Sequence, residues 1–179
     1  QGELYLTDVI AFARSRDGRV GGAVLADSVQ AEGVNDRIQL ATLSAELNRR
    51  ILRRWMADGV TVLDPATTWV HDAVDLAADV TLLPGTSLEG ATSVATGAVI
   101  GPDTTLVDVE VGEGAHVVRT HATLAVIGAG AEVGPFSYLR PGTQLGAKGK
   151  IGAFVETKNA QIGDGAKVPH LTYCGDATV

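Results

Sequence analysis

The chain has 179 residues, 45% hydrophobic and 20% charged, which is long enough and apolar enough to bury a core. Its one cysteine excludes a disulfide framework and favours a reducing cytoplasm, and a formal charge of −7 argues against general affinity for nucleic acid or anionic membranes. The apolar runs are too short to span a bilayer and residues 1–20 lack a secretory signal pattern, so we expect a soluble, cytoplasmic protein.

The start of the chain carries short patterns of two kinds. Thr7 and Asp8 are good helix N-caps and precede an apolar run at residues 9–13, so a helix is expected there. Asp17 and Gly18 predict a turn. Residues 19–25 then predict a strand.

A long helix is expected at residues 36–59. Asn35 and Asp36 offer an N-cap, and Gly59 is suited to closing the helix. Arginines crowd its second half, where the helix dipole favours cations. One stripe of the helix is apolar, because leucines and an isoleucine recur at three- and four-residue spacing at Leu40, Leu43, Leu47 and Ile51.

From about Val60 a six-residue period replaces the helical one. Glycine or another small residue often follows the periodic aliphatic residue. The count slips at residues 121–124 and again after Ile151, where we expect loops to leave the repeat. The periodic residues are Val70, Leu76, Leu82, Leu88, Val94, Ile100 and Leu106; Val111 and Val117; Ile127, Val133, Leu139, Leu145 and Ile151; and Ile162, Val168 and Cys174.

A fixed period of six predicts a three-sided coil. Each hexad forms one flat side with its aliphatic residue inward, and the small residue that follows lets the backbone turn the corner. Three hexads make one rung, and no rung is stable without its neighbours. The fold class is therefore mainly β: a left-handed parallel β-helix of hexapeptide repeats over residues 60–179. By itself the repeat is equally compatible with a scaffold or oligomerisation module.

Two cations are spaced by one rung. Arg140 follows an inward leucine, and Lys158 comes eighteen residues later, so the two should stack on one edge. Stacked cations are a natural seat for a phosphate, whereas like charges placed together for structure alone would destabilise the fold unless Glu156 compensates. A surface salt bridge is the simpler alternative for Arg140.

His170 is the candidate proton acceptor. It lies within one rung of Lys158, next to Pro169, and Tyr173 follows three residues later. Imidazole is the side chain suited to removing a proton near neutral pH, although a lone histidine is more often a passive residue. We therefore expect Arg140, Lys158 and His170 to line one edge.

Several motifs resemble one bacterial family in the family's order. They are GPFSYLRPG at residues 134–142, GAFVETKN at 152–159, VPHLTYCGD at 168–176, QGELYLTD at 1–8 and EGVNDRIQL at 32–40. The family is the bifunctional enzyme of UDP-N-acetylglucosamine synthesis, which joins a glucosamine-1-phosphate N-acetyltransferase to an N-acetylglucosamine-1-phosphate uridyltransferase. TVLDPATTW at 61–69 is closest to actinobacterial members.

The resemblance implies a division of the chain and a role for each candidate residue. Residues 1–35 would be the last, α/β part of the nucleotidyltransferase domain, 36–59 its linker helix, and 60–179 the acetyltransferase coil. His170 would be the general base for attack of the sugar amine on acetyl-CoA, Arg140 and Lys158 would hold the sugar phosphate, and Tyr173 would position the sugar. Asn35 would contact Mg²⁺ beside UTP or UDP-N-acetylglucosamine, and the assembly would be a homotrimer.

Departures from the family pattern limit what we expect of the chain. The nucleotide loop of the family and its other metal ligand are absent, as are later rungs that bind sugar and acetyl-CoA, so residues 1–179 should be an internal fragment with little activity. Cys174, a rival nucleophile, occupies an inward position and is expected to pack. His116 and His121 allow a rival zinc site of the trimeric carbonic anhydrase type.

Overall fold

The computed structural model describes residues 5–179, so the first four residues of the QGELYLTD motif lie outside it. The chain divides into two compact units, one ending at Leu40 and the other running from Ala41 to Val179. The first contains helix α1 (Asp8–Ser15) and the short 3-10 helix η1 (Ser28–Ala31), neither with a buried residue. The helix expected after Thr7 and Asp8 is therefore confirmed, whereas the assignment of residues 1–35 to a nucleotidyltransferase domain stays a prediction.

The strand predicted at residues 19–25 is wrong. These residues form no regular element, and all of them are exposed. A strand is held by hydrogen bonds to a neighbouring strand, and residues 5–40 as described contain none that could pair with it. The apolar pattern alone was not enough to predict a strand.

Helix α2 (Arg37–Ala57) begins and ends where the capping residues predict. At its start, Asp36 Oδ1 accepts from the backbone N–H of Gln39 at 2.7 Å, and Gln39 Oε1 accepts from the backbone N–H of Asn35, also at 2.7 Å. At its end Gly59 has φ +95°, a left-handed conformation that suits a helix C-cap. None of the helices in the described chain combines the length and apolar character that a membrane crossing needs.

Glu46 on α2 should make the stability of the protein depend on pH. Hydrogen bonds from Arg49 and then Arg50 lower the pKa of Glu46 to about 2. Because the folded pKa lies below the unfolded one, the contribution of Glu46 to stability is complete above about pH 4.3 and is lost as pH falls through about 2. Denaturant unfolding between pH 5 and 2 should show this decline in the native protein and a weaker one in Glu46→Gln. An equal decline in both would contradict the assignment.

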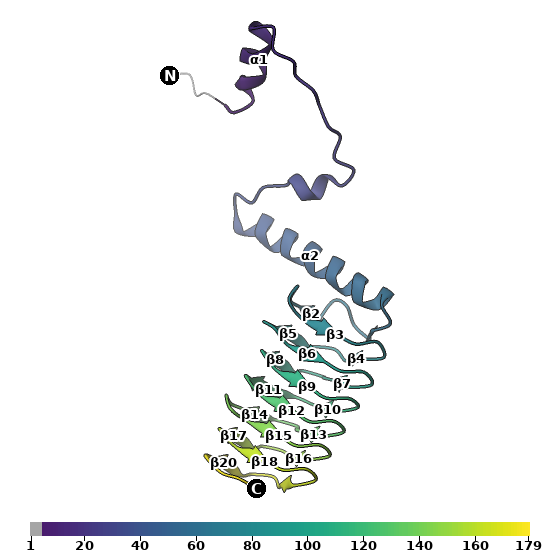
Figure 1. Cartoon of the computed structure of the whole chain (residues 1–179), viewed down its shortest axis with the longest axis vertical. Helices are drawn as coiled ribbons and strands as arrows, with labels where there is room; N and C mark the ends of the chain where they lie inside the picture. The colour runs from purple at the N-terminus through teal and green to yellow at the C-terminus, as the bar shows by residue number, and fades with distance from the viewer. Residues whose placement is uncertain (1–4) are drawn as a thin grey trace. The chain divides into compact units, whose positions relative to one another are not determined.

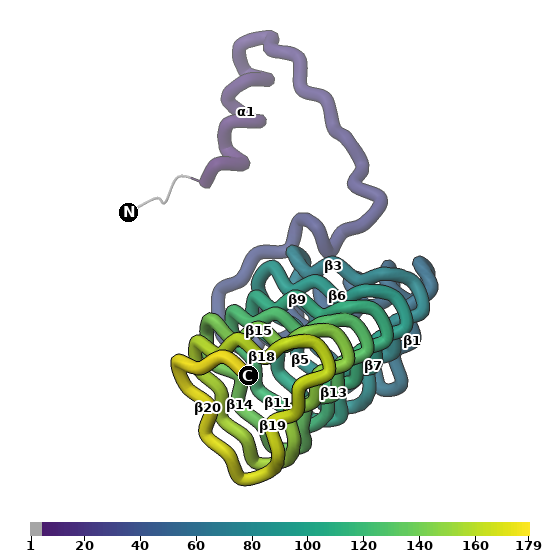
Figure 2. The backbone as a smooth tube through the Cα atoms, turned by 60° about the horizontal axis from the view of Figure 1, so that its bottom comes forward, coloured from purple at the N-terminus to yellow at the C-terminus, as the bar shows by residue number. Residues whose placement is uncertain are grey.

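Beyond α2 the chain winds into a coil of three parallel sheets (Figures 1 and 2), which confirms the three-sided fold, and the two views show it to be left-handed. Each strand pairs with the strand three places later in the chain. Sheet A contains β1 (Thr61–Val62), β4 (Thr81–Leu82), β7 (Val99–Ile100), β10 (His116–Val117), β13 (Glu132–Val133), β16 (Lys150–Ile151) and β19 (Lys167–Val168).

The other two sides have the same construction. Sheet B contains β2 (Trp69–Val70), β5 (Ser87–Glu89), β8 (Thr105–Val107), β11 (Thr120–Thr123), β14 (Ser137–Leu139), β17 (Glu156–Lys158) and β20 (Tyr173–Gly175). Sheet C contains β3 (Asp75–Leu76), β6 (Ser93–Val94), β9 (Glu110–Val111), β12 (Val126–Ile127), β15 (Gln144–Leu145) and β18 (Gln161–Ile162).

The interior of the coil is filled by the periodic residues. Every aliphatic position of the six-residue repeat, and Cys174, is buried, and each such side chain contributes about 1.5–3 kcal/mol of burial before chain entropy is subtracted. The loops expected at the two slips are absent from the described coil. Ala122 and Thr157 occupy the inward positions there, both fully buried. The count slips because sides are shortened to five residues, both sides that meet at Ala122 and the one side after Thr157.

Glycines form a column at the corner after sheet C. Gly112, Gly128, Gly146 and Gly163 each follow a buried aliphatic residue. A Cβ on Gly128 would lie 2.6 Å from the backbone nitrogen of Ala147 in the next rung, which is closer than real Cβ atoms approach. The predicted role of small residues at corners is confirmed here, because successive rungs pack backbone against backbone.

The second half of α2 closes the N-terminal end of the coil. Ile51 and Leu52 join the coil's buried cluster, and the Asn48 amide bonds to the first rung: its Nδ2 donates to the Thr68 carbonyl at 2.8 Å and its Oδ1 accepts from the Val70 N–H at 3.0 Å. The amide thus makes the two bonds that a neighbouring strand would make. The apolar stripe predicted on α2 is buried only at Ile51, whereas Leu40 and Leu47 are exposed and Leu43 is half-buried.

Candidate functional site

Arg140 and Lys158 come together as predicted. Leu139 of β14 pairs with Thr157 of β17, and the Arg140 N–H donates to the Thr157 carbonyl at 2.9 Å, so the next residues on each strand, Arg140 and Lys158, occupy equivalent places on successive rungs. Lys158 in turn pairs with Gly175 of β20. The two cations therefore form one column where sheet B turns toward sheet C.

Glu156 compensates part of this positive charge. Its Oε1 lies 2.9 Å from Arg140 Nη1, and both side chains are about 40% exposed. Exposed ion pairs of this kind contribute at most about 1 kcal/mol, so Arg140 can exchange Glu156 for a ligand anion at small cost. Lys158 is exposed and has no ion-pair partner among the described residues. A dianionic phosphate would meet one free cation and one that is weakly held.

Tyr173 reaches toward the same column because of a glycine. Its side chain lies over Gly175, so that a Cβ on Gly175 would overlap the phenol oxygen. Gly175 is the register partner of Lys158, which brings the phenol end of Tyr173 to the end of sheet B that carries the cations. Sequence analysis did not single out Gly175, because counting along the rungs gives its pairing with Lys158 but not its contact with Tyr173.

Replacing Gly175 by alanine should therefore displace Tyr173 without harming the fold. The clash is with the far end of an exposed, flexible side chain, so we expect the free energy of unfolding to change by less than about 1 kcal/mol. If Tyr173 positions the sugar, the KM for the sugar phosphate should rise roughly three- to tenfold. Steady-state kinetics and denaturant unfolding measure the two effects. An unchanged KM would remove Tyr173 from the site.

His170 lies at the other end of sheet B. It stands in the turn between β19 and β20, where sheet A passes into sheet B, while Lys158 and Arg140 stand where sheet B passes into sheet C. The imidazole is exposed, and no described residue hydrogen bonds to it. The expectation that His170 shares one edge with the two cations is therefore wrong. All of them border the outward face of sheet B, with Tyr173 between.

The reason for this separation is the length of one side. The twelve residues from Lys158 to His170 carry the chain along sheets C and A, which brings it back to the start of sheet B and not to its end. The turn at His170 is supported from the rung below, because the Leu171 N–H donates to the Ala153 carbonyl at 3.0 Å. Backbone bonding therefore holds His170 in place.

Asn35 lies apart from these residues in the sequence, at the start of α2. Its backbone N–H caps the helix with Gln39, and the side-chain cap comes from Asp36. The described residues contain no group of three histidine, cysteine, aspartate or glutamate side chains suited to a metal. One amide oxygen does not fit Mg²⁺, which binds through carboxylates. The role of Asn35 stays a prediction.

The rival chemistries find little support in the described chain. His116 pairs in register within sheet A, whereas His121 belongs to sheet B and its ring lies 5.4 Å from that of Tyr138. A zinc site of the trimeric carbonic anhydrase type is shared across a subunit boundary, so it would need a second chain. Cys174 is 8% exposed and lies in the core, as expected of a packing residue.

The coil and its outward cationic column define a hexapeptide-repeat β-helix protein. No model of a known protein family matches the chain. Curated proteins do: it is 65% identical over 178 residues to the bifunctional protein GlmU of Kineococcus radiotolerans and 65% identical over 179 residues to that of Rhodococcus jostii (strain RHA1). These matches cover 99% and 100% of this chain and 36% of each relative. Over its whole length the chain is thus similar to bifunctional GlmU proteins, and it spans about a third of their length.

Two solved structures share the coil at low similarity. The acetyltransferase domain of PglB from Neisseria gonorrhoeae is 12% identical, with a TM-score of 0.39 over 70% of this chain and 58% of that one. PerB from Caulobacter crescentus is 19% identical, with a TM-score of 0.35 over 73% and 62% of the two chains.

Proposed function

We propose that the coil transfers the acetyl group of acetyl-CoA to the amine of glucosamine-1-phosphate, on the outward face of sheet B near its last rungs. The observation that carries the proposal is the in-register column of Arg140 and Lys158, with the Tyr173 side chain lying over Gly175 beside it. The bifunctional GlmU relatives support the choice of reaction. Uridyl transfer from UTP stays a prediction of the family resemblance, because Asn35 alone does not form a magnesium site.

The phosphate is bound by charge and by shape. Arg140 offers a planar fork of N–H donors that matches two phosphate oxygens, and Lys158 adds a compact charge one rung away. Glu156 holds Arg140 at 2.9 Å and keeps its guanidinium oriented until the anion arrives. The sugar would then lie along sheet B over Tyr173, with its amine toward the corner at His170.

The chemistry is one acyl transfer with a proton relay. The amine nitrogen attacks the thioester carbon, and His170 accepts the proton that this nitrogen loses. The tetrahedral intermediate then breaks its carbon–sulfur bond, and the protonated His170 returns the proton to the departing CoA sulfur. The products are N-acetylglucosamine-1-phosphate and CoA, and no acetylated Cys174 is needed.

A homotrimer is part of this proposal, and exposed apolar side chains around sheet B support it. Phe136 and Phe154 stack at 5.1 Å at the corner before sheet B, although both are more than 50% exposed. Leu171, next to His170, is 76% exposed at the same corner, one rung further along. Apolar residues gathered in this way favour burial against another chain. A second chain could also supply the partner that His170 lacks among the described residues.

Replacing Lys158 by alanine tests the phosphate seat. We expect the KM for glucosamine-1-phosphate in the full-length protein to rise roughly 10- to 100-fold, because a charge-assisted hydrogen bond to the phosphate is lost. Release of the CoA thiol gives the rate. Lys167→Ala, which removes an exposed lysine from sheet A, is the matched control and should leave KM unchanged. Equal effects of the two substitutions would overturn the proposed seat.

A further inference from the structure

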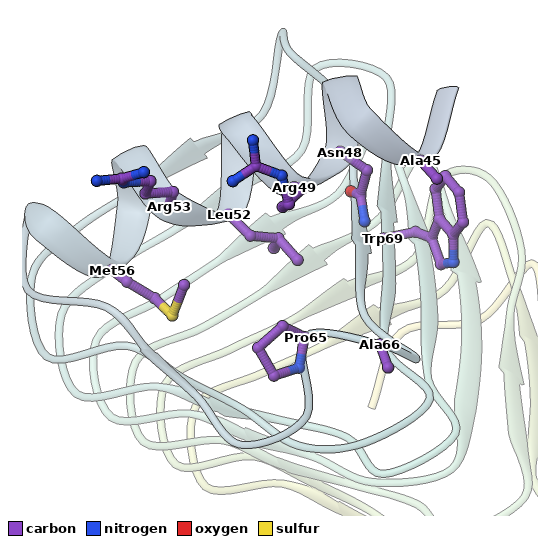
Figure 3. A pocket seen from close by; sticks show the side chains of 9 residues that line it. All are labelled: Ala45, Asn48, Arg49, Leu52, Arg53, Met56, Pro65, Ala66 and Trp69. Carbon is purple, nitrogen blue, oxygen red and sulfur yellow. The ribbon is translucent and has the colours of Figure 1, made fainter. Parts of the chain in front are cut away.

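A groove of about 350 Å³ lies where α2 crosses the first turn of the coil (Figure 3). Its two walls are α2 and the segment that leads from β1 into β2. It belongs to the first rung, whereas the proposed acetyl-transfer site lies on the last ones. The groove therefore has no part in the function proposed above, and its size is at the lower end of the range for small-molecule sites.

Hydrogen bonds hold both walls in place. Asn48 uses both ends of its amide to fix α2 to the first rung, at Thr68 and Val70. In the opposite wall Asp64 accepts from the Ala66 N–H at 3.1 Å and from the Thr67 hydroxyl at 2.8 Å, which fixes the turn at Pro65. The groove is thus formed in advance of any ligand, which lowers the entropy cost of binding.

The interior of the groove is apolar and suited to a flat ring. Leu52 and Met56 point from α2 toward Pro65 (Figure 3), and Trp69 borders the groove with 44% of its surface exposed. The thioether of Met56 makes favourable contacts with aromatic rings. Met56 is 41% exposed, so a bound ring would bury apolar surface that now faces water.

The rim of the groove carries positive charge. Arg49 and Arg53 lie along α2 at the groove (Figure 3). Arg49 is engaged by Glu46 at 2.7 Å, and the Glu46 carboxylate also pairs with Arg50. Arg53 is exposed and has no hydrogen-bond or ion-pair partner among residues 5–179. The Asp64 carboxylate faces its own turn, so Arg53 offers an unopposed fork of donors beside an apolar floor.

We propose that this groove binds a small aromatic carboxylate, with the ring between Met56 and Pro65 and the carboxylate on Arg53. A planar carboxylate matches the guanidinium fork in two parallel hydrogen bonds. The apolar side chains of the groove contact the ring, whereas a carboxylate without a ring would make no such contacts. The pairing of one free cation with one apolar slot selects ligands that carry both a ring and a negative charge.

The sequence provides a direct probe, because Met56 is its single methionine. In protein labelled with ¹³C-methyl methionine, titration with 3-phenylpropionate should shift one methyl signal and reach saturation. The uncharged 3-phenylpropan-1-ol should bind at least roughly fivefold more weakly, because it cannot use the charge of Arg53. A shift that grows linearly with concentration, or equal affinity for acid and alcohol, would overturn the proposal.

Arg53→Gln and Arg54→Gln form a matched pair on the same helix. Arg53→Gln should reduce the affinity for 3-phenylpropionate to that for the alcohol. Arg54 pairs instead with Asp72 at 3.4 Å and does not line the groove, so Arg54→Gln should change affinity less than twofold. Both side chains are exposed, and neither change should unfold the protein. Unchanged affinity in Arg53→Gln, or equal losses in the two variants, would refute the site.

Discussion

Replacing His170 by alanine in the full-length protein should lower the rate of acetyl transfer by roughly 10²- to 10⁴-fold. The imidazole is exposed, and no described residue bonds to it, so the free energy of unfolding should change by less than about 0.5 kcal/mol. The loss would therefore be chemical and not structural. The difference in rate between the variant and the native protein should become smaller as pH rises, because more of the amine substrate then loses its proton without a base. Thiol release from acetyl-CoA between pH 7 and 9 measures both effects.

His116→Ala is the matched control for this prediction. His116 projects from sheet A and belongs to no site proposed for the reaction, so its removal should leave the rate unchanged. A His170→Ala enzyme as active as the native one would end the proton-transfer role. If the native protein held stoichiometric zinc, and His116→Ala lost both the zinc and the activity, a site of the carbonic anhydrase type would be favoured instead.

Replacing Leu106 by alanine should destabilise the coil by about 2–5 kcal/mol. Leu106 is fully buried on sheet B, between Leu88 on the preceding rung and Ala122 on the following one. Ala122 is too small to fill the space that the missing leucine leaves. Each rung packs only on its neighbours, so a cavity in the middle of the coil weakens two interfaces at once. Urea unfolding followed by circular dichroism gives the change in free energy.

Leu124→Ala makes the same chemical change on the outside of the coil. Leu124 follows β11 and is 55% exposed, so its loss should change the free energy of unfolding by less than about 1 kcal/mol. If the two leucine variants lost equal stability, burial by the six-residue period would not be what holds the coil together.

The six-residue period was enough to predict the three sides, the inward residues and the stacking of Arg140 on Lys158. These features follow from counting residues alone, because each side of the coil repeats the same pattern. The position of His170 follows from the same count, because twelve residues after Lys158 make two sides and not a full rung, so the expectation of a shared edge was a miscount. A five-residue side also looks like a break in the sequence, although Ala122 and Thr157 keep the interior continuous.

Outside the coil the sequence predicted less. The start of α2 was predicted correctly, because it depends only on neighbouring residues: the Gln39 N–H donates to the side chain of Asp36. Burial of the stripe on α2 depends on where the coil begins beneath it, so Ile51 is covered and Leu47 is not. The strand expected at residues 19–25 depends on a pairing partner that no local pattern reveals. Nor does spacing show that Gly175 makes room for Tyr173, since that needs the side-chain direction.

The amide of Asn48 has a consequence for self-association. A parallel coil whose first rung offered open N–H and C=O groups would invite copies to join head to tail and grow into fibres. Asn48 occupies the groups of Thr68 and Val70, and α2 lies where an incoming copy would dock. Helix α2 therefore covers this end of the coil and engages backbone groups with which a second copy could pair.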